Sequence, residues 1–240
     1  LSLRRQRQMC IRDSSYTDAA GNSGGGDSAS ITIDTENPTA LVEFAASSLS
    51  DGSSSTDLTI TFSEVPIGFD VVADLTVTGG VLGAGTFDGA NLVWTAVYTA
   101  DDDVDVVGSV VLASASYTDA AGKAGGGDSA SVSIDTENPT ASVTVADDAL
   151  IAGETSAVTI VFNEVAVGFT NADLTVGNGT LTNVSSSDQI TWLATLTPNV
   201  DIEVTGSVIA LDLSGVADAA GNVGAGLVDS NAYTLLDLFF

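Results

Sequence analysis

The carboxylates of Asp and Glu are the side chains of this sequence that could bind a ligand or take part in a reaction, and few basic residues and no histidine are present to pair with them. The chain has 32 Asp and Glu against 5 Lys and Arg, a formal net charge of −27 and no histidine. From residue 15 onward one cation, Lys123, stands against 31 acids. The missing histidine removes the commonest general base. The single cysteine, Cys10, excludes an internal disulfide and a cysteine-based zinc site. The function that remains for these side chains is to bind a hard cation through their oxygen atoms.

Internal repetition shows which elements must position these acids. Residues 16–38 and 117–139 are identical at 19 of 23 positions, and a weaker third copy of the block begins at Val216. The aspartates near the start of the three blocks are 101 and 99 residues apart. Further motifs recur between the blocks in matched pairs: TFSEVPIGF (61–69) with VFNEVAVGF (161–169), and ADLTV at 73–77 and 172–176. The sequence therefore predicts a structural unit of about 100 residues that occurs in tandem.

Apolar and polar residues alternate along the segments between these motifs. Leu58, Ile60 and Phe62 alternate with threonines, and the matching positions of the second unit do the same. Such alternation is typical of antiparallel sheets that pack face to face. We expect seven strands in the first unit, near 40–46, 57–63, 74–79, 81–87, 91–99, 105–116 and 128–134. This pattern predicts an all-β chain of tandem immunoglobulin-like sandwich domains with about seven antiparallel strands each.

The boundaries follow from the two DTENP segments, in which proline ends strand pairing. We expect the first Ig-like domain at 35–135, the second at 136–236 and a tail at 237–240. Residues 15–34 would be the last hairpin of a preceding repeat. Residues 1–14 hold most of the cations and resemble translated sequencing-adapter sequence, so we interpret them as a non-native segment. A signal peptide is disfavoured there because no apolar run follows the arginines.

Three motifs in a fixed order relate the chain to a known group. These are the FxE…GF block, the ADLTV block, and the DAAG turn that precedes a strand and the D-T-x-x-P segment. In this order they resemble the bacterial Ig-like repeats of large surface adhesins and biofilm-associated proteins. The resemblance covers residues 15–230 and implies a linear, secreted array on the bacterial cell surface. It also implies calcium binding where domains meet, as in many members.

The expected strand order brings remote acids to one pole of each domain. The linker, the loop after the second strand and the turn before the last strand all lie at the pole where the chain enters. In the first domain we expect Asp34, Glu36, Glu64, Asp74 and Asp119 there. In the second domain we expect Asp135, Glu137, Glu164, Asp173, Asp218 and Asn222. Crowded carboxylates repel one another and raise each other's pKa, and salt bridges cannot neutralise them because one lysine is available.

Calcium is the ligand that this pole predicts, since Ca²⁺ takes six to eight oxygens whereas Mg²⁺ demands strict octahedral geometry. The second domain offers the better candidate site, because Lys123 replaces the asparagine found at 22 and 222 and its ammonium could occupy part of the cation's place in the first. The open alternative is that these residues only form Asx-turns and that the acidity aids solubility.

Other chemistry is disfavoured by the residues around each candidate. The glycine runs at 24–26 and 125–127 lack the Lys-Ser/Thr of a phosphate loop. Trp94 and Trp192 lie on the alternating inner faces and are expected in the core. The acidic surface should repel nucleic acid and anionic lipid, and no apolar run is long enough for a membrane helix.

These observations predict a structural role and no enzyme activity. We expect an extender or stalk of a large secreted or cell-surface adhesin, rigidified by Ca²⁺, whose partners are neighbouring Ig-like repeats of the same chain. The receptor that such a protein would bind is not predicted. Three alternatives stay open: a glycan- or ligand-binding Ig-like module, accessory domains of a secreted hydrolase, and generic acidity in a salt-adapted organism.

Overall fold

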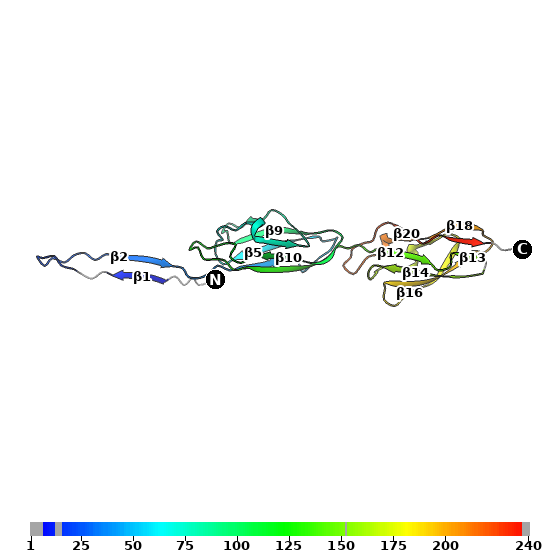
Figure 1. The fold of residues 1–240 in the computed structure, drawn as a ribbon, viewed down its shortest axis with the longest axis horizontal. Helices are drawn as coiled ribbons and strands as arrows, with labels where there is room; N and C mark the ends of the chain where they lie inside the picture. The colour runs from blue at the N-terminus through cyan, green and yellow to red at the C-terminus, as the bar shows by residue number, and fades with distance from the viewer. Residues whose placement is uncertain (1–6, 13–15, 152, 237–240) are drawn as a thin grey trace. The chain divides into compact units, whose positions relative to one another are not determined.

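The computed structural model describes residues 7–12, 16–151 and 153–236. By its internal contacts the chain divides into two compact units (Figure 1). The first unit takes its described residues from Leu1–Ala46, Thr56–Tyr98 and Gly108–Ser131. The second takes them from Ser47–Ser55, Thr99–Val107 and Val132–Phe240. Strands make up nearly all of the regular secondary structure of both units, so the prediction of an all-β chain is confirmed.

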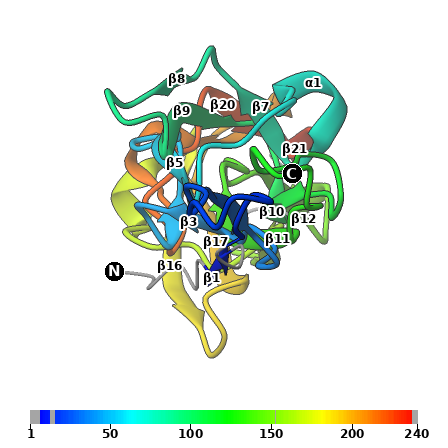
Figure 2. The same cartoon turned by 90° about the vertical axis from the view of Figure 1, so that its left-hand side faces the viewer.

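The first sequence repeat, residues 35–135, is built on two sheets with the expected alternation. One sheet has the strand order β3-β5-β9-β7, with β8 beside β9, and the other has the order β4-β11-β10-β6. The strands of the first sheet are β3 (Ala40–Phe44), β5 (Ser55–Phe62), β7 (Gly80–Leu82), β8 (Thr86–Phe87) and β9 (Val93–Ala100). Those of the second are β4 (Ser48–Leu49), β6 (Leu75–Thr78), β10 (Asp105–Leu112) and β11 (Asp128–Asp135). A short helix, α1 (Val71–Asp74), leads into β6 (Figure 2).

Aromatic rings form the centre of the first unit's core. The Phe62 ring makes edge-to-face contacts with the rings of Phe69 and Tyr117, at centroid distances of 5.4 and 5.0 Å. Trp94 packs edge-on against Phe69 at 5.8 Å and is buried, as the sequence predicted. The two phenylalanines of the FxE…GF block therefore serve the core, which leaves the glutamate between them on the loop.

The second sequence repeat follows a similar plan, but its remaining strands form two three-stranded sheets. Its sheets have the orders β12-β14-β17-β16, β13-β21-β18 and β15-β19-β20. The first comprises β12 (Ala141–Val145), β14 (Ser156–Phe162), β16 (Gly179–Ser186) and β17 (Thr191–Pro198). The others comprise β13 (Ala149–Ile151), β15 (Leu174–Val176), β18 (Val204–Ser207), β19 (Ile209–Asp212), β20 (Leu227–Asp229) and β21 (Tyr233–Leu236). Two short 3₁₀ turns, η1 (Asn171–Asp173) and η2 (Leu213–Gly215), complete the unit. The edge strand β16 is drawn in yellow in Figure 2.

The same aromatic arrangement centres the second core. Phe169 makes edge-to-face contacts with Phe162 at 5.2 Å and with Trp192 at 4.9 Å. Around these rings β14 buries every second residue, as two packed sheets require. Trp192 is partly buried against this core, in agreement with its expected place.

Each repeat contains a parallel pairing near its two chain ends. In the second, β13 runs parallel to β21, with Ala149 opposite Thr234 and Ile151 opposite Leu236. In the first, the two-residue strand β4 runs parallel to the end of β11, with Ser48 opposite Ser133. These pairings join an early strand of the repeat to its last strand.

The N-terminal segments form a separate hairpin-like pair. β1 (Arg7–Arg12) pairs antiparallel with β2 (Ser28–Ile33), from Arg7 opposite Ile33 to Arg12 opposite Ser28. Every residue of β2 is exposed. Of the segment predicted to be non-native, residues 1–6, 13 and 14 lie outside the described residues, as does the tail at 237–240. No helix in the described part of the chain is long and apolar enough to span a membrane.

Candidate metal centres

A hydrogen-bonded turn fixes the aspartate at the centre of each acidic group. In the first repeat the turn lies between β10 and β11, where Asp119 Oδ1 accepts hydrogen bonds from the N–H groups of Ala121 and Lys123, both at 2.8 Å. Gly122 has φ +79°, in the left-handed region that glycine adopts without strain. The DAAG sequence therefore folds into an Asx-type turn that commits one carboxylate oxygen to the backbone.

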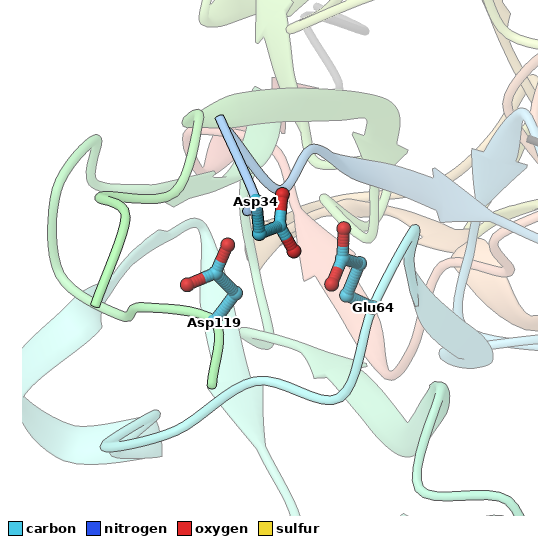
Figure 3. Close-up of side chains that lie close together, drawn as sticks. All are labelled: Asp34, Glu64 and Asp119. Atoms are coloured by element: carbon cyan, nitrogen blue, oxygen red, sulfur yellow. The ribbon is translucent and has the colours of Figure 1, made fainter. Parts of the chain in front are cut away.

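Two further acids meet Asp119 at this turn. Asp34 follows β2 in the DTENP segment, and Glu64 lies two residues after β5. One oxygen from each of the three carboxylates lies within 4.8 Å of the others (Figure 3). Asp119 is 2 % exposed, while Asp34 and Glu64 are half-buried. Three negatively charged side chains from segments far apart in sequence therefore lie close together in the first unit.

The second oxygen of Asp119 is the unusual atom of this group. Asp119 Oδ2 is buried and has no hydrogen-bond partner within the part of the chain that the structure describes. Burying a carboxylate oxygen without a partner is costly, because water no longer solvates its charge. A hard cation bound among the three carboxylates would supply the missing partner, and carboxylate oxygens are the ligands that Ca²⁺ prefers.

The second repeat builds the same trio from the equivalent positions. Asp135 ends β11, Glu164 lies two residues after β14, and Asp218 occupies the turn before β20; one oxygen from each lies within 4.8 Å of the others. Asp218 Oδ1 accepts the N–H groups of Gly221 at 2.6 Å and Asn222 at 2.8 Å. Two groups of three carboxylates thus recur one repeat apart.

Asn222 distinguishes the second group from the first. It is fully buried, and its Nδ2 donates to Asp218 Oδ2 at 2.6 Å and to the Asp135 carbonyl at 2.8 Å. Its Oδ1 accepts the Asp51 N–H at 2.8 Å, within the same unit. Both oxygens of the turn aspartate are therefore hydrogen-bonded in this repeat.

Crowding changes the acidity of the second group. Burial, followed by the charges of Asp218 and Asp135, raises the pKa of Glu164 from an ordinary value of 4.5 to about 7. Burial also raises the pKa of Asp135, with smaller contributions from Asp218 and Asp105. These shifts mean that keeping all three carboxylates charged is unfavourable without a counter-charge.

The remaining predicted residues lie beside the two trios or away from them. Glu36 is exposed, and its N–H donates to Asp34 Oδ1 at 3.2 Å. Glu137 accepts a hydrogen bond from Asn163 Nδ2 at 3.0 Å and lies at the edge of the second trio. Asp74 and Asp173 instead accept backbone N–H groups of Asp70 and Thr170, both at 2.7 Å, at the short helical turns α1 and η1. The structure thus leaves these two carboxylates in capping roles.

Sequence reasoning missed the residue that precedes each clustered glutamate. Asn163 Nδ2 bridges Glu137 and Glu164, at 3.0 and 3.4 Å, while its Oδ1 accepts the Thr140 N–H at 2.7 Å. The matching Ser63 Oγ accepts the Thr39 N–H at 2.9 Å in the first repeat. The signal was present in the F-[S/N]-E block, where a small polar residue occupies this position in both copies. It fastens the incoming linker to the loop that carries the glutamate.

Comparison with known proteins gives a family and distant structural neighbours. A family described as bacterial Ig-like domain matches residues 34–136 and 135–235. Invasin, a bacterial integrin-binding protein, is 14% identical at a TM-score of 0.42, over 89% of this chain and 44% of invasin. The Escherichia coli adhesin FdeC is 13% identical at a TM-score of 0.38, over 90% of this chain and 71% of FdeC. The Yersinia pseudotuberculosis adhesin InvE is 14% identical at a TM-score of 0.33, over 80% of this chain and 58% of InvE. No curated protein matches.

Proposed function

The chain belongs to the bacterial Ig-like domain family, and we propose that its two domains form an extender, or stalk, of a larger adhesin on the bacterial cell surface. In this role the domains hold a binding tip away from the cell during adhesion or biofilm formation. They catalyse no reaction, and their partners are neighbouring Ig-like repeats of the same chain. The solved adhesin structures are longer than this chain, which spans 44% of invasin and 58% of InvE, so receptor binding would belong to other parts of the protein.

The observation that carries this proposal is the recurrence of one acidic trio at the start of each repeat. Asp34 and Asp135 both come from DTENP segments, which link one repeat to the next, while the other two acids come from loops of the repeat that follows. A cation held by such a trio would tie the linker to that repeat. We propose Ca²⁺ in this role, because a linker fastened at every junction favours an extended, stiff array.

Calcium also fits the charge and the setting. Residues 16–236 contain Lys123 as their only basic side chain, so a divalent ion is the available counter-charge for the trios. Extracellular modules bind Ca²⁺ with dissociation constants of roughly 10⁻⁴–10⁻³ M. Sites of that affinity would fill outside a cell and empty inside it, which couples stiffening to secretion.

The alternative of glycan binding by these domains has less support. Stacking on a sugar needs exposed aromatic rings, but Trp94 is buried and Trp192 is partly buried in the core. The exposed aromatic side chains of the described residues are Tyr16 and Phe87, and they lie in different segments. The structural role therefore remains the better proposal.

Calcium titration of the full 240-residue chain tests the proposal, with the melting temperature and the radius of gyration as measurements. Linkage predicts that a site with 100-fold excess of free ligand over its dissociation constant stabilises the fold by about 2.7 kcal/mol. We expect stabilisation that grows with the logarithm of free Ca²⁺, together with a larger radius of gyration. Mg²⁺ and NaCl at matched ionic strength should reproduce only a small part of this.

A charge-matched pair of variants controls for general acidity. Combining Glu164→Ala with Asp218→Ala should remove the response of the second site. Combining Glu43→Ala with Asp57→Ala removes the same charge from exposed strand positions and should leave the response unchanged. Equal responses of the two double variants, or of Ca²⁺ and NaCl, would contradict a specific calcium role and favour generic acidity.

A further inference from the structure

The turn that carries the central aspartate occurs three times, and the residue four positions after that aspartate differs between copies. Asp18, Asp119 and Asp218 each accept, through Oδ1, the backbone N–H of that residue at 2.8 Å. The residue is Asn22 in the first copy, Lys123 in the second and Asn222 in the third. The backbone hydrogen bond of the turn is therefore constant, while the side chain at this position varies.

Where this residue is asparagine, its amide occupies the second oxygen. Asn22 Nδ2 donates to Asp18 Oδ2 at 2.8 Å, and Asn222 Nδ2 donates to Asp218 Oδ2 at 2.6 Å. In the third copy the same amide nitrogen also reaches the carbonyl oxygen of Asp135 at 2.8 Å. A cation that uses Asp218 Oδ2 must first displace these hydrogen bonds.

Where the residue is lysine, no amide is present to make this bond. Asp119 is only 2 % exposed, and its Oδ2 is buried and has no hydrogen-bond partner in the described part of the chain. One carboxylate oxygen each from Asp34, Glu64 and Asp119 lies within 4.8 Å of the other two (Figure 3). This group therefore offers a cation an oxygen that makes no competing hydrogen bond.

We infer that the residue four positions after the turn aspartate sets the cation affinity of each acidic trio, and that the trio of Asp34, Glu64 and Asp119 is the tighter Ca²⁺ site. This inference rests on the proposed calcium role, and it favours the trio that the sequence alone made the weaker candidate. The physical reason is competition: an amide that bonds a buried carboxylate must be displaced by the ion, and a bond to a charged group is among the stronger hydrogen bonds.

The positive charge of Lys123 opposes this effect but is the weaker influence. Its side chain is half-exposed, so water and salt screen the repulsion between its ammonium and an incoming ion. An amide bonded directly to a buried oxygen is not screened in this way. The competing hydrogen bond should therefore outweigh the repulsion from the lysine.

Isothermal titration of the full chain with CaCl₂ tests the inference through two variants that remove the same charge. Lys123→Met removes the ammonium and supplies no donor, whereas Lys123→Asn removes it and supplies the amide found in the other two copies. We expect the first site of Lys123→Asn to bind Ca²⁺ about tenfold more weakly than that of Lys123→Met, equivalent to ~1.4 kcal/mol. Asp119→Asn and Asp218→Asn assign the two binding events, and Asp119→Asn should remove the tighter one.

The possible outcomes separate this inference from the proposal beneath it. Equal affinity of Lys123→Asn and Lys123→Met, or a tighter site in the second repeat, would overturn the inference while calcium binding itself stands. The absence of any Ca²⁺-specific binding by the wild-type chain would overturn both. Circular dichroism and melting temperature of each variant without calcium confirm that the folds being compared are the same.

Discussion

Residues 16–33 and residues 117–134 carry almost the same sequence and form the same turn, yet they differ in burial. In both, the turn aspartate accepts two backbone N–H groups. In both, a glycine eight residues after the tyrosine, Gly24 or Gly125, donates its N–H to the tyrosine carbonyl. Tyr16 is 65 % exposed, however, while Tyr117 is 1 % exposed and packs on Phe62. The turn is thus a local structure that its own hydrogen bonds maintain, and burial comes from the sheets around it.

The largest effect that this comparison predicts is at the tyrosine. Tyr117→Ala removes a buried ring and its hydrogen bond to the Gly126 carbonyl, and should lower the free energy of unfolding by about 3–5 kcal/mol. Tyr16→Ala should change it by less than ~0.5 kcal/mol, as for other exposed positions. Urea denaturation followed by tryptophan fluorescence measures both. Similar losses in the two variants would show that residues 16–33 belong to a cooperative core.

The strand that follows the turn gives the next effect. Ile134 in β11 is fully buried, and its counterpart Ile33 in β2 is 39 % exposed. Ile134→Ala should cost about 2–5 kcal/mol through lost burial and the cavity left behind, whereas Ile33→Ala should be nearly neutral. The same denaturation measurement applies, and a destabilising Ile33→Ala would indicate that β2 packs against other residues in solution.

A smaller difference is expected at the asparagine of the turn. Asn222→Ala leaves Asp218 Oδ2 and the Asp135 carbonyl without their donor, so it should cost about 1–3 kcal/mol without calcium. Asn22→Ala removes an exposed hydrogen bond to Asp18 and should be close to neutral. Saturating Ca²⁺ should reduce the loss in Asn222→Ala, because the ion can take the freed oxygen. An equal loss with and without Ca²⁺ would contradict that competition.

The smallest effect is a pH dependence of opposite sign at the isolated turn aspartate, Asp18, and at the crowded loop glutamate, Glu164. Hydrogen bonds from the Asn22 side chain and backbone lower the pKa of Asp18 below 3.8, whereas burial and neighbouring charges raise that of Glu164 to about 7. A raised pKa means that the folded state holds the proton more strongly than the unfolded state. The contribution of Glu164 is therefore present below pH 4.5 and is lost as the pH rises through about 7.

Carboxyl-carbon NMR in a chelator measures both titrations, and Glu164→Gln supplies the control. The difference in unfolding free energy between the wild-type chain and Glu164→Gln should change between pH 4.5 and 7 and be flat above and below that range. A Glu164 midpoint near 4.5 would show that the three acids of the second repeat do not crowd one another in solution.

Much of the fold could be predicted because alternation along a strand reports directly on which face is buried. The family resemblance and the tandem Ig-like sandwiches are confirmed, and the expected strands near 57–63 and 128–134 coincide with β5 and β11. The short strands β4 and β13 were missed. A segment of two or three residues has no readable period, and its parallel partner lies far along the chain.

The candidate site was only partly predictable. Topology alone placed the linker, loop and turn acids at one pole, and the structure brings three of them together in each repeat. Topology could not show that Asp74 and Asp173 would accept hydrogen bonds from nearby backbone N–H groups, although Thr170 and Asp173 have the spacing of a capping box. Nor could it show which carboxylate oxygen lacks a partner, since that depends on the side chain opposite it.

The parallel pairing of β13 with β21 has a consequence for a protein pulled from its two ends. Tension draws an early strand back toward the N-terminus and the last strand forward toward the C-terminus, so the two must slide past each other. Their evenly spaced hydrogen bonds are then strained together in shear and cannot open one at a time, as they would in a hairpin peeled from its end. We expect a single abrupt extension event per repeat in single-molecule pulling. Thr234→Pro, which would remove the β21 N–H that donates to the Asp148 carbonyl at 2.7 Å, should lower the force at which the second repeat yields.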